Sequence, residues 1–193
     1  MSLGKRTGFD SREEVREGLK KVGYIAADRI ANTVYLASHL AKPILVEGPA
    51  GVGKTELAKA TASFMGVPLI RLQCYEGLDE SKALYEWKYG KQLLYTQLLK
   101  DKIDRIVQGE TDLSESIEKL HQYDDIFFSR RFLEPRPLLK ALQQKEGAVL
   151  LVDEVDKSDD EFEAFLLEIL SDFQVSIPEI GTIEATSVPF VFL

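Results

Sequence analysis

The chain has 193 residues, of which 45% are hydrophobic and 29% are charged, and its formal net charge at pH 7 is −8. This length suits one domain, or one domain with an appendage. The acidic balance argues against a nucleic-acid-binding face, and no apolar run approaches the roughly 18 residues that span a bilayer. Cys74 is the single cysteine, so no internal disulfide can form, and we expect a protein of the reducing cytoplasm.

Residues 1–43 predict an N-terminal helical segment. Ser11 followed by Glu14 is a capping-box pattern that begins a first helix. A second helix carries one apolar stripe, and Pro43 ends it just before an apolar strand at 44–47. The residues of the stripe are Ile30, Val34, Ala37 and Leu40.

The most informative pattern is a glycine-rich loop at 48–55, between that strand and a helix at 56–64. It reads G-x-x-x-x-G-K-[ST], in which glycines let backbone N–H groups turn toward phosphate oxygens. Lys54 can reach the β- and γ-phosphates of a nucleotide, and the Thr55 hydroxyl can ligate Mg²⁺. The alternative is a glycine-rich turn that fits the pattern by chance. We predict a nucleotide site with these contacts: Gly48, Pro49, Ala50, Gly51, Val52, Gly53, Lys54, Thr55 and Glu56.

A second strand is predicted at 69–73, and the sequence then becomes polar and helical from 76 to about 132. That segment is too long for a strand-to-helix connection, so we interpret it as a helical insertion. Pro135 and Pro137 precede a helix at 138–145 that returns the chain to the sheet. One helical side of the insertion is formed by Leu93, Leu94, Gln97, Leu98 and Ile103.

An unbroken apolar run at 148–152 indicates a central parallel strand that is covered on both faces. Asp153 and Glu154 follow at its carboxyl end, where ligands bind in open α/β sheets. There Asp153 is placed to hold Mg²⁺ through water, while Glu154 could polarise the attacking water as a general base. Acids often end strands in a solvated loop, but the preceding loop at 48–55 makes a catalytic pair the better interpretation.

The last part of the chain predicts a helix, a hairpin at 173–185 with its turn at 178–181, and a final buried strand at 188–193. Ser158 and Asp159 can cap the helix. The core face of that helix consists of Phe162, Phe165, Leu166, Ile169 and Leu170. The whole pattern predicts an α/β fold over residues 44–193, a three-layer parallel sheet of the P-loop type with a helical insertion and a β-hairpin.

Two motifs resemble those of the AAA+ ATPases, namely the loop at 48–55 and the run at 150–156, which reads LLVDEVD. The stretches at 71–79 and 165–178 resemble the MoxR group, including the CoxD-like accessory ATPases of molybdenum hydroxylase maturation. This resemblance covers about 26–193. It implies the AAA+ type of P-loop fold and a ring, usually a hexamer, that binds ATP and Mg²⁺ between subunits and remodels a protein partner. It also implies partners with von Willebrand factor A domains, in chaperone-like maturation or metal-centre insertion.

The resemblance also implies roles for individual residues. In the family, the segment before the first strand often packs on adenine, and its counterpart here contains Tyr24 and Ile25. An ordinary turn between two helices is equally consistent with these residues. The hairpin at 174–185 would face a pore or a substrate, unless it is a plain hairpin. Phosphate, Mg²⁺ and the attacking water would be handled by Lys54, Thr55, Asp153 and Glu154.

The chain ends at Leu193, before the polar sensor residue, arginine fingers and helical lid of the family it resembles. We therefore expect an N-terminal fragment that binds ATP weakly and hydrolyses it slowly or not at all, because an arginine finger contributes ~10³ to 10⁵ in turnover. Three other functions stay open. They are a nucleotide-occupancy module without hydrolysis, a small-molecule kinase, and a DNA-processing AAA+ motor, against which the acidic balance counts.

Overall fold

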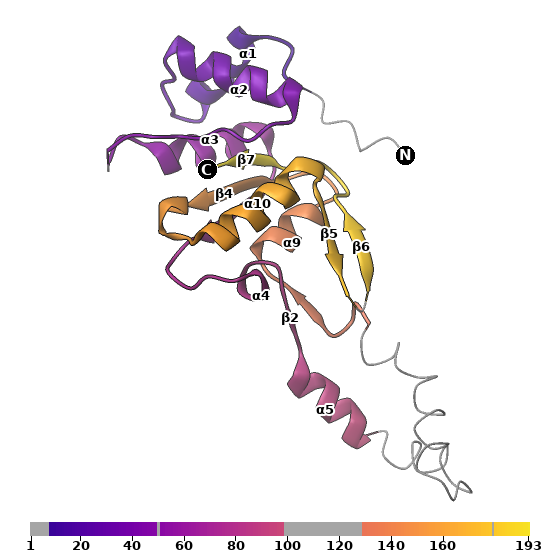
Figure 1. Cartoon of the computed structure of the whole chain (residues 1–193). Helices are drawn as coiled ribbons and strands as arrows, with labels where there is room; N and C mark the ends of the chain where they lie inside the picture. The colour runs from indigo at the N-terminus through magenta and orange to yellow at the C-terminus, as the bar shows by residue number, and fades with distance from the viewer. Residues whose placement is uncertain (1–7, 50, 99–128, 179) are drawn as a thin grey trace, which may run out of the picture.

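A parallel sheet forms the centre of the molecule, with the strand order β1 (Leu69–Gln73), β4 (Val149–Asp153) and β7 (Phe190–Phe192) (Figure 1). β4 pairs with both neighbours, and its register with β1 places Gln73 opposite Asp153. The predicted parallel sheet with β4 at its centre is therefore confirmed. The computed structural model describes residues 8–49, 51–98, 129–178 and 180–193.

The residues at 44–46 extend this sheet beside β7. Ile44 forms a parallel bridge with β7, and the Val46 N–H donates to the Leu193 carbonyl at 2.9 Å. The strand predicted there is thus reduced to a short paired stretch. It leads directly into the loop at 48–55, so that the loop begins at the carboxyl edge of the sheet.

Two helices precede the sheet, α1 (Arg12–Lys21) and α2 (Asp28–Leu40). α1 begins as predicted, because the Ser11 Oγ accepts from the Glu14 N–H at 3.0 Å. The Glu14 carboxylate accepts in turn from the N–H of Asp10 at 2.6 Å, one residue before the position that a capping box would use.

The apolar stripe predicted on α2 is correct except for its last member. Val34 and Ala37 are buried and Ile30 is half-buried, whereas Leu40 is 65% exposed. Ala41 follows in a left-handed conformation with φ of 51° and ends the helix. The chain turns toward the sheet at this point, which leaves Leu40 on the surface.

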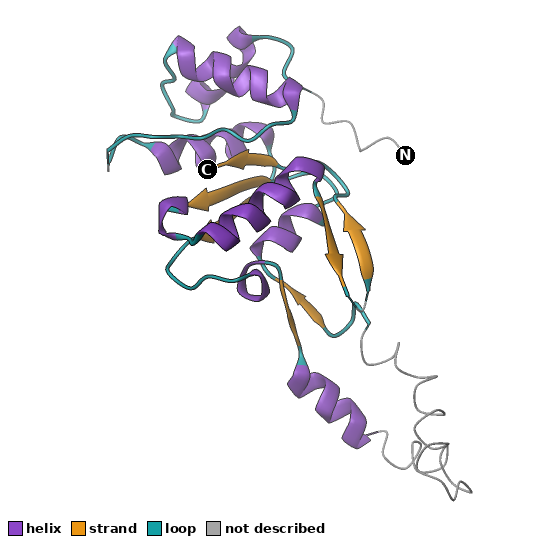
Figure 2. Ribbon diagram, in the orientation of Figure 1, coloured by secondary structure: helices purple, strands orange, loops and turns teal. Residues whose placement is uncertain are grey.

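The sheet is the middle of three layers, as predicted (Figures 1 and 2). Alternate side chains of β4 belong to two different cores. Val149 and Leu151 pack with the first two helices and α3, whereas Leu150 and Val152 pack with α9 and α10. This double burial explains why the strand is apolar at every position before Asp153. The covering helices are α3 (Lys54–Met65), α9 (Pro137–Leu142) and α10 (Asp160–Asp172).

The segment predicted as a helical insertion contains a strand as well as helices, and this strand pairs with another just after the predicted end of the insertion. β2 (Tyr85–Trp87) and β3 (Leu133–Pro135) pair antiparallel, and α4 (Glu80–Ala83) and α5 (Tyr89–Leu98) flank β2. Strands of three residues are too short to show a period of two in the sequence, so the prediction missed them. The rest of the insertion, at 99–128, lies outside the described residues.

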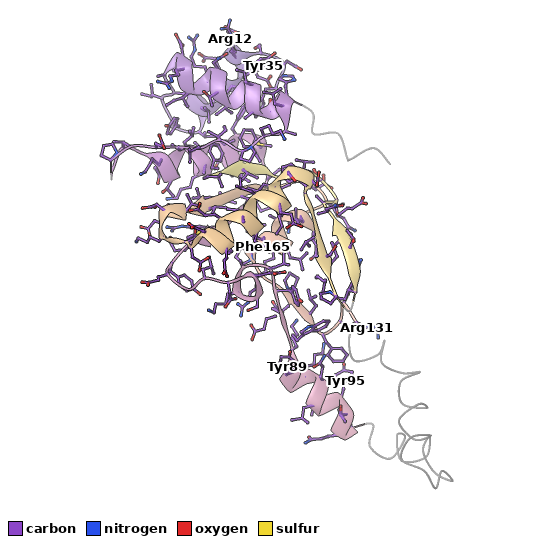
Figure 3. All side chains as sticks on the ribbon, viewed as in Figure 1. Arg12, Tyr35, Tyr89, Tyr95, Arg131 and Phe165 are labelled. Atoms are coloured by element: carbon purple, nitrogen blue, oxygen red, sulfur yellow. The ribbon has the colours of Figure 1, made fainter. Side chains whose placement is uncertain are left out.

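The apolar residues of α5 stand largely on the surface. Leu93 is 60% and Leu98 is 73% exposed. Tyr95 is held more closely, because its ring meets that of Phe132 edge-on with 5.3 Å between centroids (Figure 3). Ile103, predicted on the same helical side, lies outside the described residues.

The predicted C-terminal hairpin is confirmed, with β5 (Gln174–Ile177) and β6 (Gly181–Glu184) paired antiparallel. α10 begins at Asp159, whose carboxylate accepts from the Phe162 N–H at 2.9 Å. The helix predicted at 138–145 is α9, which ends earlier than predicted. None of the helices in the described part of the chain is long and apolar enough to cross a membrane.

Candidate functional site

The loop at 48–55 has the backbone shape that its glycines predict. Gly48, Gly51 and Gly53 have φ angles of 149°, 84° and 88°, which side chains with a Cβ rarely adopt. Ala50 lies outside the described residues. Gly53 is the N-cap of α3, so the loop delivers the chain to a helix start, where unpaired N–H groups and the helix dipole favour an anion.

Lys54 is the first residue of α3 and folds back over the loop. Its Nζ donates to the Gly48 carbonyl at 2.6 Å, and its side chain is only partly exposed. Thr55 follows in the same helical turn and is also half-buried. The ammonium and the hydroxyl therefore both stand beside the curled backbone, as a phosphate-binding loop requires.

One cavity brings the loop and the two acids of β4 together. It has a volume of about 310 Å³, and its lining includes Gly48, Lys54 and Thr55 on one side and Asp153 and Glu154 on the other. These residues are about a hundred positions apart in the sequence, and the parallel sheet places them at the same edge. An ammonium group, a hydroxyl and two carboxylates thus line the same cavity.

A second cavity of about 510 Å³ lies next to the first, and Lys54 lines both. Its walls come from the N-terminal helices and the loop, including Tyr24, Arg29 and Val52. Burial raises the pKa of the Tyr24 phenol. Ile25 is 90% exposed and does not line this cavity. Of the two residues predicted against adenine, the structure places only Tyr24 where a base could lie.

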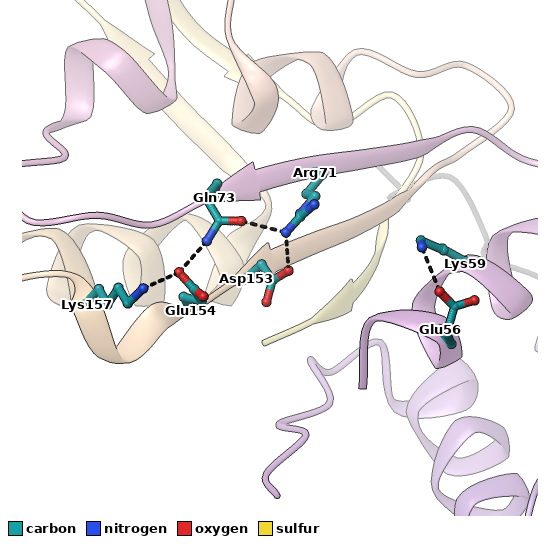
Figure 4. Close-up of polar contacts among 7 residues, drawn as sticks. All are labelled: Glu56, Lys59, Arg71, Gln73, Asp153, Glu154 and Lys157. Carbon is teal, nitrogen blue, oxygen red and sulfur yellow. Dashed lines mark hydrogen bonds and ion pairs between the residues drawn. The ribbon is translucent and has the colours of Figure 1, made fainter. Parts of the chain in front are cut away.

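Several predicted contacts lie at the edge of the site or outside it. Pro49, Gly51 and Glu56 line neither of the two cavities. The Glu56 carboxylate accepts instead from the Lys59 Nζ at 2.7 Å on the outer side of α3 (Figure 4). Backbone groups of the loop can still face a phosphate without their side chains lining a cavity.

Two polar side chains of β1 join the two acids, and a lysine from the short helix after β4 extends this chain of contacts (Figure 4). The Asp153 Oδ2 accepts from the Arg71 Nη2 at 2.7 Å, and the same Nη2 donates to the Gln73 Oε1 at 2.6 Å. The Gln73 Nε2 donates to the Glu154 Oε2 at 2.7 Å. Lys157 completes the chain, because its Nζ donates to the same Glu154 oxygen at 2.6 Å.

These contacts favour the ionised form of Glu154. The hydrogen bond from Lys157 lowers the pKa of the Glu154 carboxyl, and the charges of Lys157 and Arg71 lower it further. Glu154 also has a left-handed backbone with φ of 57°, which is uncommon for a residue with a side chain and often occurs at functional sites. A carboxylate held ionised at neutral pH is the form that a general base needs.

Sequence analysis did not assign Arg71, Gln73 or Lys157 to the site. The sequence could have indicated Arg71 and Gln73 by their positions. Alternate residues of a strand share one face, so polar residues near the carboxyl end of β1 lie next to the acids at the end of β4. Lys157 falls in the short 3₁₀ helix η1 (Val155–Lys157), three residues after Glu154.

The donor set suits a metal ion that arrives with phosphates. Among the described residues, no group of three or more histidine, cysteine, aspartate or glutamate side chains is placed to hold a metal ion. Thr55 and Asp153 line the same cavity, and both offer the oxygen ligands that Mg²⁺ prefers. Mg²⁺ usually binds through one or two protein oxygens together with substrate phosphates and water, so these two residues fit that mode.

Comparison with known proteins agrees with this geometry. A family model described as "ATPase family associated with various cellular activities (AAA)" matches residues 44–192. The crystal structure of a presumed ATPase from Cytophaga hutchinsonii superposes with a TM-score of 0.54 at 17% identity, over 94% of this chain and 42% of that one. At that identity the likeness concerns the fold, and the chain spans less than half the length of that structure. No curated protein matches the chain.

Proposed function

The chain belongs to the AAA family of ATPases, and on this premise we propose that the cavity between the loop at 48–55 and the end of β4 binds Mg·ATP for hydrolysis. One observation carries the proposal: Lys54, Thr55, Asp153 and Glu154 all line that cavity. They are the four kinds of group that phosphoryl transfer requires, because the reaction depends on charge neutralisation and positioning more than on covalent chemistry.

Each residue has a distinct task in this proposal. Lys54 exchanges the Gly48 carbonyl for the β- and γ-phosphate oxygens, while the N–H groups of the loop surround the phosphates. Thr55 and Asp153 hold Mg²⁺, which when bound neutralises charge on the phosphates. Glu154 accepts the proton of the attacking water, a role for which a carboxylate must be ionised.

The second cavity supports a place for the nucleoside. It continues from Lys54 toward Tyr24 and Arg29, so a triphosphate on the loop directs its sugar and base to the N-terminal helices. Those helices pack in the same core as α3 and one face of β4. Residues 1–43 would then form one wall of the nucleotide site of the core at 44–193.

A finer proposal concerns the biological role. We infer a MoxR-type remodelling ATPase of the cytoplasm that assembles into a homo-oligomeric ring. It acts without a nucleic-acid partner, on a protein that carries a von Willebrand factor A domain. The resemblance at 71–79 and 165–178 supports this proposal, as does the acidic net charge of −8 against nucleic acid. Light scattering with and without Mg·ATP tests the ring: a molecular mass that stays at that of one chain contradicts it.

The test of hydrolysis uses Glu154→Gln with Glu168→Gln on α10 as the matched control, since Glu168 is exposed and lies outside both cavities. Release of labelled phosphate from ATP is followed with a large excess of protein, which detects slow turnover. We expect Glu154→Gln to bind ATP and release no phosphate, while the control behaves as the wild type. Phosphate release by Glu154→Gln at the wild-type rate contradicts the role of Glu154. Binding without any release by the wild type favours the nucleotide-occupancy module.

A further inference from the structure

Arg71 forms an ion pair with Asp153, the acid that we place at the metal. Its Nη2 lies 2.7 Å from the Asp153 Oδ2 and 2.6 Å from the Gln73 Oε1, so two acceptors hold the guanidinium against Asp153 (Figure 4). Arg71 and Gln73 are two positions apart on β1, and Gln73 is opposite Asp153 in the register with β4. The contact therefore follows from the sheet itself.

Arg71 contacts Asp153 from outside the cavity in which we place the nucleotide. Asp153 lines the cavity with Lys54 and Thr55, whereas Arg71 does not line it. Asp153 is also the more buried partner, with a side chain 21% exposed against 53% for Arg71. The direct contacts of Arg71 are with Asp153 and Gln73, so it acts on the metal side of the cavity through Asp153, which makes Arg71 a positioning residue.

We propose that Arg71 is a resident counter-cation of Asp153 that competes with Mg²⁺, and so sets the metal concentration at which the site binds a metal–nucleotide complex. The proposal rests on the proposed function, because it takes Asp153 as the metal-side acid. A guanidinium N–H on Oδ2 occupies acceptor capacity that a metal-bound water would otherwise use. Its positive charge also opposes the approach of a second cation to the same carboxylate.

The half-exposed position of Arg71 allows such an exchange. A side chain 53% in contact with solvent can leave Asp153 and become hydrated without leaving a buried charge behind. Lys157 differs in this respect, since its Nζ bonds Glu154 and not Asp153. The hydrogen bond that a metal-bound water would have to displace on Asp153 is therefore the one from Arg71.

The experiment titrates Mg²⁺ into the chain with a fixed amount of mant-ATP, starting in EDTA, and follows fluorescence anisotropy. For Arg71→Ala and for Arg71→Gln, which keeps a polar side chain, we expect half-maximal metal response at ~3- to 10-fold lower Mg²⁺ than in the wild type. Arg16→Ala is the matched control, because it breaks an exposed pair with Asp28 at 3.2 Å in the N-terminal helices. In an Asp153→Asn background, Arg71→Ala should produce no further shift.

An unchanged or higher Mg²⁺ midpoint in both Arg71 variants overturns the inference, because a residue that merely orients Asp153 for the metal would weaken metal binding when removed. Urea unfolding of each variant confirms that it is folded. If the wild type binds mant-ATP but the Mg²⁺ midpoint of both Arg71 variants is unchanged, the inference is refuted and the proposed function is not. No binding of mant-ATP by the wild type at any Mg²⁺ concentration refutes the proposed function, and the inference with it.

Discussion

The Nζ of Lys157 lies 2.6 Å from the Oε2 of Glu154, three residues earlier in the chain. The pair lies at the carboxyl end of β4, where β4 gives way to a single turn of 3₁₀ helix. Both side chains are about half exposed, so the pair contributes little to folding. Its main effect is to lower the pKa of Glu154, the residue that we assign as the general base.

Replacement of Lys157 tests that effect. Lys157→Ala removes the largest cause of the lowered Glu154 pKa, so we expect the carboxyl to titrate closer to its ordinary value. Because the ionised form is the base, the acid limb of hydrolysis moves to higher pH. A ¹³C NMR titration of the Glu154 carboxyl measures the shift directly. Lys59→Ala, which breaks the equivalent pair with Glu56, is the control, and equal titration curves for the two variants contradict the assignment.

The single cysteine provides a second test. Cys74 is buried beyond the end of β1, and burial, with the charges of Asp153 and neighbouring acids, raises the pKa of its thiol to about 11. The folded chain therefore keeps the thiol protonated at pH 8, and labelling by a thiol reagent such as DTNB should be slow until urea unfolds the protein.

The raised pKa of the Cys74 thiol makes folding stability depend on pH in a defined direction. A raised thiol pKa gives stability that is complete below the ordinary value near 9 and is lost as the pH rises toward about 11. Between pH 8 and pH 10.5, the urea midpoint should fall further in the wild type than in Cys74→Ala. Rapid labelling of the folded chain at pH 8 would contradict the buried position of Cys74.

The core on the α10 side of the sheet supports a stability prediction. Leu170 is 3% exposed within that core, whereas Leu167 on the same helix is 63% exposed. Leu170→Ala should lower the free energy of unfolding by about 2–5 kcal/mol, because it leaves a cavity among packed side chains. Leu167→Ala should change it by less than about 0.5 kcal/mol. Urea denaturation measures both, and similar losses in the two variants would show that α10 packs through another face.

The loop glycines give a prediction that separates binding from folding. An added Cβ at Gly53 meets no atom within 4 Å, yet φ is +88° there. Gly53→Ala thus meets no clash, and its cost of about 1–2 kcal/mol arises from the left-handed backbone. We expect the loop to relax and ATP affinity to fall. Gly66→Ala, at the opposite end of α3 with φ of +67°, should lower stability and leave affinity unchanged. Equal affinities in both variants contradict a loop shaped for phosphate.

Much of this molecule follows from sequence, because the strongest signals are local. The run Val149–Asp153 is apolar at every position before its final acid, and the structure places it at the sheet centre. The glycines of the loop at 48–55 predict a backbone that turns toward phosphate, and all three have positive φ. The capping residues Ser11 and Asp159 likewise mark true helix starts.

The remaining features depend on contacts that no local pattern encodes. The pairing of Arg71 with Asp153 joins residues 82 positions apart and requires the register of two parallel strands. β2 and β3 are three residues each and pair across the insertion, so neither shows a period in the sequence. Leu40 has the spacing of the apolar stripe in the sequence, but the chain turns at Ala41 and the Leu40 side chain lies on the surface.

The central claim is that Lys54 and the loop at 48–55 bind the phosphates of ATP. Isothermal titration of Mg·ATP into the wild type, Lys54→Ala and Lys59→Ala tests it most directly, since Lys59 lies on the same helix but pairs outward with Glu56. We predict binding by the wild type and by Lys59→Ala, and a loss of at least ~10-fold in affinity for Lys54→Ala, the result of removing a charge-assisted contact to phosphate. Equal affinities in Lys54→Ala and Lys59→Ala would contradict the account.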